Sequence, residues 1–459
     1  MSEKLVVIGG DAAGMSAASQ ARRRRGPDDL EIVAFESGHY TSYAACGIPY
    51  YLGGVVKEFD SLIVREPEEF RRRQSIDVRI RHEATEIDLD ARKVRVRDLD
   101  EGTESVEGFD ILHIATGAKP IRPDWPGVEA DGIFGVQVLA HARTLDDYLR
   151  TWEPRRAVIV GGGYIGLEMA EAFNDRGLSV TLVENAPEPM RTVDPDMGAA
   201  IREAMTKFGI EVHAGVTAEG FESKDGRVSA VVTDRGDVPA DVVVLGLGVQ
   251  PNAQLAADAG LDIGESGGIV VDRRMKTSAD GVYSAGDCAE KFHLISRKGV
   301  AVALGTHANK EGRVAGVNIG GGYETFPGVL GTAAVKVCDV EVARTGLNET
   351  EATAAGFEYF TTLAESTTRA GYYPDAKLIR IKLIVENGTG RLLGAQIVGH
   401  ENAAKRIDAF AAMLWHDMTV DEIMHVDLAY APPFAPTWDP ILIAARKAWE
   451  RLERSRGDA

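Results

Sequence analysis

Cys46 is the side chain in this sequence with the clearest potential for covalent chemistry. It lies in the segment SYAACGIPYY at residues 42–51, which contains no second cysteine. A lone thiolate reacts by forming a mixed disulfide or a sulfenic acid, because an internal dithiol cannot form. Gly47 and Pro49 indicate a sharp strand-to-helix junction, and the start of a helix stabilises a thiolate. The pattern therefore predicts a catalytic nucleophile with a stabilised anion.

A glycine turn before this segment predicts a first dinucleotide site. The apolar run at 5–8 leads into Gly9–Gly14, and an expected helix at 15–25 and a second strand follow. That strand ends in Glu36, where a carboxylate can accept hydrogen bonds from ribose hydroxyls while the helix N-terminus faces the pyrophosphate. Asp11 occupies the place of the middle glycine, so the match depends on the position of Glu36.

A second glycine turn follows the apolar strand at 157–160 and matches the same pattern more fully. The turn Gly161–Gly166 contains all three glycines, and a helix is expected at 167–176. The next strand ends in Glu184, whose carboxylate favours a free ribose 2′-hydroxyl over a 2′-phosphate. NADH is therefore the expected cofactor, and NADPH stays possible because Arg191 is in reach of a 2′-phosphate.

Two dinucleotide sites in one chain indicate electron transfer between two cofactors. A strand and turn at 109–118 is expected to close the first domain, and a strand at 277–288 ends in Gly286-Asp287. A carboxylate at such a strand end can bond a polyol hydroxyl. The other two cysteines, Cys288 and Cys338, are interpreted as small buried hydrophobic residues.

Composition narrows the class of protein. A length of 459 residues predicts two or three domains, and a net charge of −19 argues against nucleic acid or an anionic membrane as a partner. No signal peptide, membrane span, disulfide framework or metal site is predicted. The expected location is the cytoplasm.

The order of these motifs resembles that of two-dinucleotide flavoprotein disulfide reductases. The resemblance implies an α/β fold with two Rossmann-like domains and a C-terminal α+β dimerisation domain. It implies an FAD domain at 1–118 and 250–325, an NAD(P)H domain at 119–249 and a dimerisation domain at 326–459. The FAD residues that it implies are Gly9, Gly10, Ala13, Gly14, Glu36, Ala84, Ala115, Thr116, Gly117, Asp287 and Thr306. The NAD(P)H residues that it implies are Gly161, Gly163, Ile165, Gly166, Glu184 and Gly248.

The cysteine pattern resembles that of the single-cysteine branch of this family. Members with a redox disulfide carry a second cysteine where this chain has Tyr51. Within the branch, the segment around Cys46 is most similar to coenzyme A-disulfide reductases. Oxidases and peroxidases typically carry a histidine where this chain has Ala12. The resemblance implies a homodimer with shared active sites, to which the partner subunit supplies the catalytic residues Tyr372 and Tyr430.

The resemblance also implies a substrate and a cycle. Reducing equivalents pass from NAD(P)H through FAD to a mixed disulfide of Cys46 with coenzyme A or a related small disulfide or persulfide. The residues expected to line the substrate site are Gln20, Arg23, Ser42, Arg73 and Asn309. Ala45 and Trp438 depart from the family pattern and favour weaker affinity for coenzyme A. Two alternatives stay open: an NADH oxidase or peroxidase with a Cys46 sulfenic acid, and a flavoprotein redox sensor that binds a protein partner.

Overall fold

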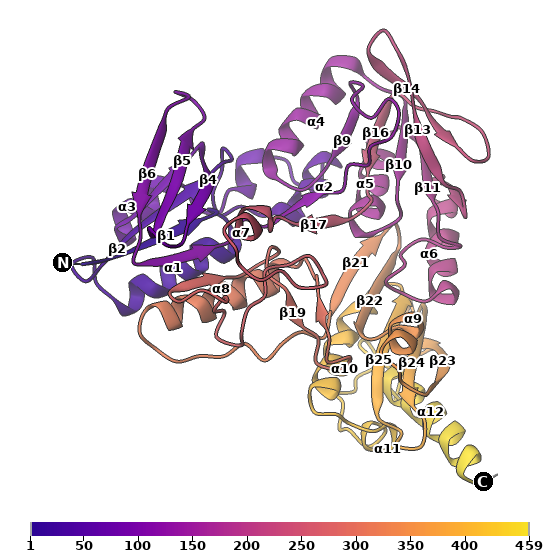
Figure 1. The fold of residues 1–459 in the computed structure, drawn as a ribbon. Coiled ribbons are helices and arrows are strands. Elements are labelled where there is room, and N and C mark those ends of the chain that lie inside the picture. Colours follow the sequence, from indigo (N-terminus) through magenta and orange to yellow (C-terminus); the bar gives the residue numbers. More distant parts are fainter. Residues whose placement is uncertain (1, 458–459) are drawn as a thin grey trace.

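Three five-stranded sheets organise the computed structural model, which describes residues 2–457 (Figure 1). The first two sheets are parallel throughout and the third is antiparallel. The central strands of the parallel sheets contain runs of buried apolar residues, such as 5–8 and 157–160, because both faces of each sheet are covered. The predicted fold class, with two Rossmann-like domains and a C-terminal α+β domain, is confirmed. The domain boundaries stay a prediction.

The first sheet takes strands from two distant parts of the chain. Its order is β18-β7-β1-β2-β3, with β18 (Val282–Ser284), β7 (Ile111–Ile114), β1 (Glu3–Ile8), β2 (Leu30–Glu36) and β3 (Ile76–Ile80). One face packs on α1 (Ala12–Arg24) and α8 (Gly305–Ile319), and α3 (Pro67–Gln74) lies beside them. The other face is covered by the small sheet of β4 (His82–Asp88), β5 (Lys93–Asp98) and β6 (Glu104–Gly108).

The second sheet has the order β12-β11-β10-β16-β9. Its strands are β12 (Glu211–Ala214), β11 (Ser179–Glu184), β10 (Arg156–Val160), β16 (Val242–Leu245) and β9 (Ile133–Gly135). Its helices are α4 (Leu139–Trp152), α5 (Tyr164–Asp175) and α6 (Pro195–Lys207), which cover one face. A small sheet of β13 (Ala218–Lys224), β14 (Arg227–Thr233) and β15 (Val238–Pro239) covers the other.

The third sheet has the order β21-β22-β25-β24-β23. Its strands are β21 (Ala333–Val337), β22 (Val340–Gly346), β25 (Leu392–Gly399), β24 (Leu378–Glu386) and β23 (Tyr359–Thr367). Alternate side chains face opposite ways, so Val342 and Val398 pack on the helices of the second sheet. Ala343 and Ile397 face α10 (Ile407–Trp415) and α12 (Pro440–Gly457).

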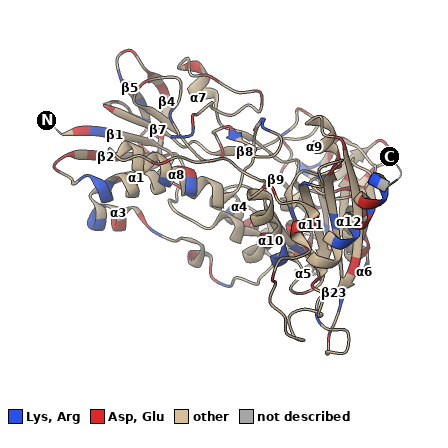
Figure 2. Ribbon diagram, turned by 90° about the horizontal axis from the view of Figure 1, so that it is seen from below, with Lys and Arg blue, Asp and Glu red and all other residues tan. Residues whose placement is uncertain are grey.

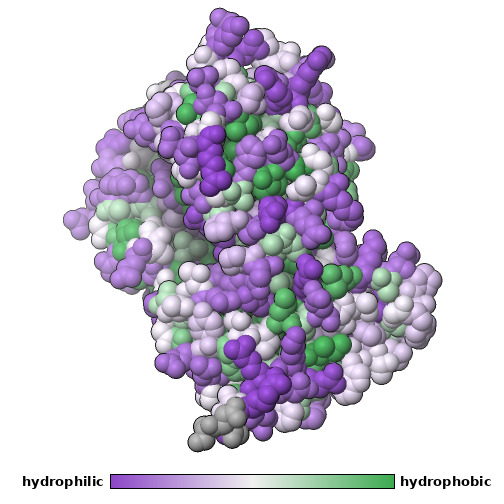
Figure 3. Space-filling view, turned by 90° about the vertical axis from the view of Figure 1, so that its right-hand side faces the viewer, coloured by the Kyte–Doolittle hydropathy of each residue, from purple (hydrophilic) through white to green (hydrophobic). Residues whose placement is uncertain are grey.

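Short elements complete the chain. They are η1 (Ala45–Gly47), α2 (Ile48–Leu52), η2 (Phe59–Leu62), β8 (Ala118–Pro120), β17 (Val249–Pro251), α7 (Gln254–Asp258), β19 (Lys291–Phe292), β20 (Gly299–Val300), α9 (Glu349–Ala354), η3 (Ala404–Arg406) and α11 (Val420–Ile423). Seen from the right of Figure 1, the surface is largely hydrophilic with apolar side chains in small separate groups (Figure 3). Within residues 2–457, no helix combines the length and the apolar character needed to cross a bilayer.

The two glycine helices begin earlier than the sequence predicts. They start at Ala12 and Tyr164 rather than at residues 15 and 167. The last glycine of each turn therefore lies inside the first helical turn, against the carbonyl oxygen of the first glycine. A Cβ on Gly14 would lie 1.9 Å from the oxygen of Gly9, and one on Gly166 would lie 2.0 Å from that of Gly161.

Candidate active site

The first glycine turn follows β1 and is shaped to receive an anion. Gly9 has a φ of +107°, and a Cβ there would lie 2.1 Å from the backbone oxygen of Ala115, so only glycine fits. The helix that follows has 13 residues, and its N-cap residue Asp11 makes no side-chain capping bond. The first N–H groups of α1 therefore remain available to a pyrophosphate.

Glu36 stands at the end of β2 directly behind this turn. Its two carboxylate oxygens accept hydrogen bonds from the N–H groups of Gly10 at 2.7 Å and Gly38 at 2.6 Å. Burial raises the pKa of Glu36, and the two backbone donors oppose that effect. The side chain thus holds the turn in shape. Its predicted contact with a ribose hydroxyl stays a prediction.

Asp11, which replaces the middle glycine, joins the turn to the cysteine segment. Its carboxylate accepts a hydrogen bond from the backbone N–H of Tyr43 at 3.2 Å, and the N–H of Ser42 donates to the oxygen of Gly10 at 3.1 Å. Burial, together with the nearby carboxylate of Glu36, raises the pKa of Asp11 to about 7. The departure from the glycine pattern therefore has a structural use.

Asp287 follows β18 and carries the observation that best supports a bound flavin. Its Oδ1 atom is buried and has no hydrogen-bond partner among the residues that the structure describes. The turn before it is fixed from behind, because Gly286 donates its N–H to Glu311 at 2.9 Å and its carbonyl accepts from Lys291 at 2.7 Å. A buried acceptor without a donor costs free energy, and a polyol hydroxyl would supply that donor. These residues fit FAD.

The other predicted FAD residues lie on several elements around this turn. Thr116 donates its hydroxyl to the backbone oxygen of Asn252 at 2.6 Å, which links the end of β7 to the strand β17 region. Thr306 is exposed in the first turn of α8. The remaining members are Gly10 and Ala13 by the turn, Ala84 on β4, and Ala115 and Gly117 after β7.

The second glycine turn repeats this geometry on the second sheet. Gly161 has a φ of +101°, and a Cβ there would lie 2.5 Å from the backbone oxygen of Gly246. Gly163 is the N-cap of α5, a helix of 12 residues that has no side-chain capping bond. Ile165 lies in its first turn, and Gly248, with a φ of +91°, follows the neighbouring strand β16. These residues fit the pyrophosphate of NAD(P)H.

The carboxylate of Glu184 accepts more hydrogen bonds from its own chain than the sequence indicates. It is 5% exposed, and its oxygens accept from the N–H groups of Gly162 at 2.6 Å and Ala186 at 2.7 Å. The guanidinium of Arg191 lies 3.7 Å from it and donates to Asn185 at 2.6 Å. A cation beside this carboxylate offsets the repulsion that would exclude a 2′-phosphate.

Cys46 lies in the short 3₁₀ turn η1 that leads into α2, at the predicted junction, and its side chain is exposed. Partial burial of Cys46 and the carboxylates of Glu168, Asp287 and Asp11 raise the pKa of its thiol. The helix α2 has only five residues, so its start opposes these effects weakly. The predicted stabilisation of the thiolate by the helix start and the flavin together stays a prediction.

Two consecutive tyrosines attach the cysteine helix to the second sheet's helices. Tyr51 donates its hydroxyl to Asp146 on α4 at 3.1 Å, and Tyr50 donates to Glu168 on α5 at 3.3 Å. Asp146 is 4% exposed and is also paired with Arg176 at 2.6 Å. At position 51, where family members with a redox disulfide carry their second cysteine, Tyr51 therefore links α2 to α4.

Glu168 is the functional residue that sequence reasoning passed over. Burial raises the pKa of its carboxyl to about 7, and the hydrogen bond from Tyr50 opposes that effect. Its charge acts directly on Cys46. The only sequence signal was its place in the first turns of the helix after Gly166, which gives no information about a neighbour 122 positions earlier in the chain.

The other two cysteines are structural, as predicted. Cys288 is 0% exposed, and its sulfur hydrogen bonds to the backbone oxygen of Ala285 at 3.4 Å. Cys338 is 6% exposed, and burial raises the pKa of its thiol to about 12. Neither thiol is suited to nucleophilic chemistry.

Tyr372 and Tyr430 lie on loops of the third-sheet domain rather than in a core. Their side chains are 78% and 50% exposed. The neighbouring phenol of Tyr430 raises the pKa of Tyr372. Phe434 and Trp438, at 71% and 55% exposed, extend the same C-terminal loop. Because these four aromatic side chains are exposed, another chain could contact them. The catalytic role of Tyr372 and Tyr430 stays a prediction.

The predicted substrate residues lie on α1, α3 and α8 and at the start of the cysteine segment. Gln20 accepts from Arg23 at 3.2 Å on α1, and Asn309 on α8 accepts from Ser16 at 2.9 Å. Arg73 on α3 pairs with Glu69 at 3.4 Å. Ser42, with a φ of +48°, starts the cysteine segment. In Figure 2, blue segments of the ribbon mark basic positions on α3 and near α1.

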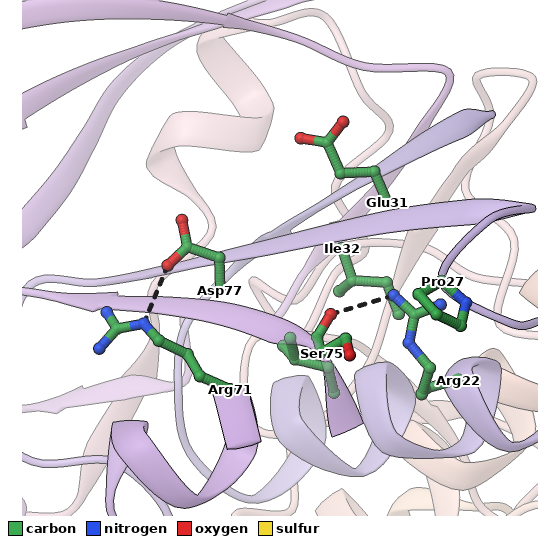
Figure 4. Close-up of a pocket in the computed structure, with 8 residues that line it drawn as sticks. Arg22, Pro27, Glu31, Ile32, Arg71, Ser75 and Asp77 are labelled. Carbon is green, nitrogen blue, oxygen red and sulfur yellow. Dashed lines mark hydrogen bonds and ion pairs between the residues drawn. The ribbon is translucent and has the colours of Figure 1, made fainter. Parts of the chain in front are cut away.

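A surface cavity of about 300 Å³ lies close by and is separate from the candidate site. Arg22, Arg71 and Asp77 are among its lining residues (Figure 4). It opens where β2 and β3 begin, whereas the glycine turn and Cys46 lie at the opposite, carboxyl edge of this parallel sheet. Its arginines are engaged, since Arg71 pairs with Asp77 at 3.1 Å and Arg22 donates to the oxygen of Ser75 at 3.1 Å.

Each of the two parallel sheets carries a glycine turn for a dinucleotide. Together with the unpaired carboxylate oxygen of Asp287 and the lone exposed Cys46, these turns define a two-dinucleotide flavoprotein oxidoreductase. The chain belongs to the pyridine nucleotide-disulphide oxidoreductase family, whose model matches residues 3–323, and the family's dimerisation domain matches residues 332–440. This family uses FAD and NAD(P)H. The chain is thus an NAD(P)H-dependent flavoprotein reductase by class.

Comparison with individual proteins gives similarities along nearly the whole chain. An NAD(P)H coenzyme A polysulfide/persulfide reductase of Pyrococcus horikoshii is 41% identical over 97% of this chain and 98% of its own. An NADH oxidase of Methanocaldococcus jannaschii is 36% identical over 98% and 99%, and a coenzyme A disulfide reductase of Staphylococcus epidermidis is 28% identical over 97% and 99%. The solved structure of an NAD-dependent persulfide reductase from A. fulgidus has a TM-score of 0.95 and 41% identity over 98% of this chain and 84% of that chain.

Proposed function

We propose that this protein uses NAD(P)H to reduce coenzyme A disulfide, or a related low-molecular-weight disulfide or persulfide, through a mixed disulfide on Cys46. The proposal rests on Cys46, a lone exposed cysteine whose pKa is affected by Asp287, the residue that fits the flavin. Tyr51 fills the place of a second thiol. Relatives named for coenzyme A persulfide and disulfide reduction support the substrate class.

Each step on the protein's side has a residue to perform it. The Cys46 thiolate attacks one sulfur of the substrate, forms a mixed disulfide and releases the other sulfur as a thiolate. The basic side chains of Arg23 and Arg73 are suited to the phosphates of coenzyme A. Bound FAD supplies two-electron transfer between NAD(P)H and the mixed disulfide. In the proposed homodimer, the active site is shared between subunits. There, Tyr372 and Tyr430 of the partner subunit protonate the leaving thiolate.

The test combines mass spectrometry with turnover. Non-reduced wild-type enzyme is expected to carry an adduct of coenzyme A mass on Cys46, removable by dithiothreitol. A Cys46→Ser variant, with a Cys338→Ser variant as the matched control, is expected to lose roughly a thousandfold or more of its disulfide-dependent NADH oxidation. Full turnover by Cys46→Ser with intact flavin would refute the proposal.

The M. jannaschii relative named NADH oxidase keeps one alternative open, a Cys46 sulfenic acid that turns over oxygen or peroxide. Parallel assays decide between the two. Oxygen or peroxide consumption that exceeds disulfide reduction at equal NADH, together with an oxygen adduct on Cys46, would favour the oxidase. Disulfide or persulfide reduction that exceeds oxygen consumption favours the reductase.

A further inference from the structure

The loop between β11 and α6, residues 185–194, closes one side of the second glycine turn. The N–H of Met190 donates to the oxygen of Gly162 at 2.8 Å. The Cα of Pro189 lies so close that a Cβ on Gly162 would come within 3.3 Å of it. The loop also carries Arg191, which stands over Glu184. Its conformation therefore sets the shape of the nucleotide end of the site.

This loop is held by the third-sheet domain rather than by its own. Arg344 on β22 donates to the backbone oxygen of Thr192 at 2.8 Å, and its guanidinium is fixed by Glu351 at 2.6 and 2.9 Å. The side-chain amide of Asn348 donates to the backbone oxygens of Arg191 at 3.3 Å and Thr192 at 3.5 Å. The acceptors are all main-chain atoms of the loop.

The end of the loop is held more tightly still. Gln396 on β25 makes two hydrogen bonds with Asp194, one from its amide to the carboxylate and one from the Asp194 N–H to its oxygen, both 2.7 Å long. The other carboxylate oxygen accepts from the N–H of Glu349 at 3.0 Å, and the ammonium of Lys382 lies 3.1 Å from the oxygen that accepts from Gln396. Gln396 is 1% exposed and Asp194 3%.

Apolar contacts already fix how the two domains sit together, because Val342 and Val398 pack into the same core as the helices of the second sheet. The polar contacts add direction. Buried polar groups that are fully paired specify one arrangement of the chain and are costly when a partner is lost. Here the atoms held by these contacts are main-chain atoms of residues 191, 192 and 194 and the carboxylate of Asp194, all in the loop next to the glycine turn.

We propose that Arg344, Asn348 and Gln396 are positioning residues for NAD(P)H, through which the dimerisation domain fixes the 185–194 loop in its nucleotide-binding conformation. The inference rests on the proposed function only in placing NAD(P)H at the second glycine turn. It is independent of which disulfide is reduced and of the chemistry at Cys46. Cofactor affinity therefore depends on a domain that carries no glycine turn.

Two variants of the holoenzyme test this. Asn348→Asp keeps the side-chain oxygen that caps α9 by accepting from Glu351 N, but it replaces the amide donor that faces Arg191 and Thr192 with a second acceptor. Gln396→Met keeps the volume and removes both bonds to Asp194. The control is Arg380→Lys on β24, where the side chain pairs with Glu365 on the neighbouring strand.

Binding of NAD⁺ by calorimetry, which needs no turnover, is expected to weaken roughly three- to tenfold in each variant, the effect of one or two hydrogen bonds. KM for NADH rises by a similar factor while kcat, flavin content and dimer mass stay near wild type, and Arg380→Lys changes none of these. Unchanged NAD⁺ affinity in Asn348→Asp, or an equal loss in Arg380→Lys, would overturn the inference. If Gln396→Met loses its dimer, Asn348→Asp alone decides. Wild-type enzyme that binds NAD⁺ but reduces no disulfide or persulfide would instead count against the proposed function and leave this inference standing.

Discussion

Tyr50 donates a hydrogen bond to Glu168 at 3.3 Å, and this bond joins the helix that follows Cys46 to the helix that follows the second glycine turn. Tyr50 lies on α2 and Glu168 on α5, so the bond joins the cysteine segment of the predicted FAD domain to the predicted NAD(P)H domain. It also keeps a carboxyl with a pKa of about 7 next to the reactive sulfur. The protonation of one acid thus affects the nucleophile.

The first prediction concerns the acidity of Cys46. Glu168→Gln removes a negative charge that opposes the thiolate, so we expect the pKa of Cys46 to fall. The rate of iodoacetamide labelling of reduced enzyme, followed against pH, measures this, because Cys288 and Cys338 are buried. Glu171→Gln is the control, since Glu171 bonds the backbone N–H of Cys338 at 3.0 Å. An unmoved labelling midpoint in Glu168→Gln would show that the charge does not reach the sulfur.

The second prediction concerns stability against pH. The pKa of Glu168 is raised from its ordinary 4.5 to about 7 in the folded chain. The stability that this group contributes is therefore complete below about pH 4.5 and is lost as the pH rises through 7. The Glu168→Gln variant lacks that loss. Its melting temperature is expected to gain on the wild type as the pH goes from 5 to 8, and a constant difference over that range would contradict the assignment.

The third prediction separates shared from unshared active sites. Co-expressed Cys46→Ser and Tyr430→Phe chains form heterodimers. If the tyrosine acts across the interface, one site of each heterodimer contains both native residues and activity is restored. If it acts within one chain, every site lacks one residue and the mixture is no more active than the two homodimers. Turnover of the purified, differentially tagged heterodimer gives the answer.

The fourth prediction concerns the turn that presents Asp287. Glu311 accepts the Gly286 N–H, and Lys291 holds the Gly286 carbonyl. Glu311→Ala leaves a buried ammonium without its carboxylate partner at 3.6 Å, and such a loss is strongly destabilising locally. We expect purified Glu311→Ala to contain less flavin per chain by absorbance at equal folded protein. Glu311→Gln, which retains an acceptor for Gly286, is expected to keep more; equal flavin content in wild type and Glu311→Ala would disprove this.

The fifth prediction concerns the choice of nicotinamide cofactor. Arg191 stands beside Glu184 and is 65% exposed at its side chain. Arg191→Ala is expected to raise KM for NADPH roughly tenfold, a loss typical of a charge-assisted hydrogen bond, with a smaller change for NADH. Arg202→Ala is the control, because Arg202 lies on α6 and its side chain pairs with Glu188 of the same loop. Equal effects on both cofactors would assign Arg191 to shape rather than to phosphate recognition.

The parts of the fold that could be predicted from sequence are those fixed by local rules. Gly9, Gly14, Gly161 and Gly166 stand where a Cβ would strike the backbone, and each apolar run after or before them became a buried parallel strand. The interpretation of Cys288 and Cys338 followed from size and polarity alone. These features need only neighbours in the chain, so spacing carries the information.

The parts that could not be predicted depend on contacts between distant segments. Spacing could not show that Glu168 and Asp287, which are far from Cys46 along the chain, raise the pKa of its thiol. Nor could it show that Gly162 and Ala186 donate to the oxygens of Glu184, whose ribose contact stays a prediction. Spacing reveals which residue types are present at a strand end, but not which donors surround them.

The hydrogen bond from Tyr51 to Asp146 has a consequence for engineering. Installing a second thiol by Tyr51→Cys, to convert the chain to dithiol chemistry, would remove one of the donors to Asp146 and the side-chain hydrogen bond from α2 to α4. The helix would then depend on its buried Ile48 and Leu52 and on Arg176 to hold the new sulfur in place. A change of redox chemistry at this position therefore requires a replacement anchor elsewhere on the same helix.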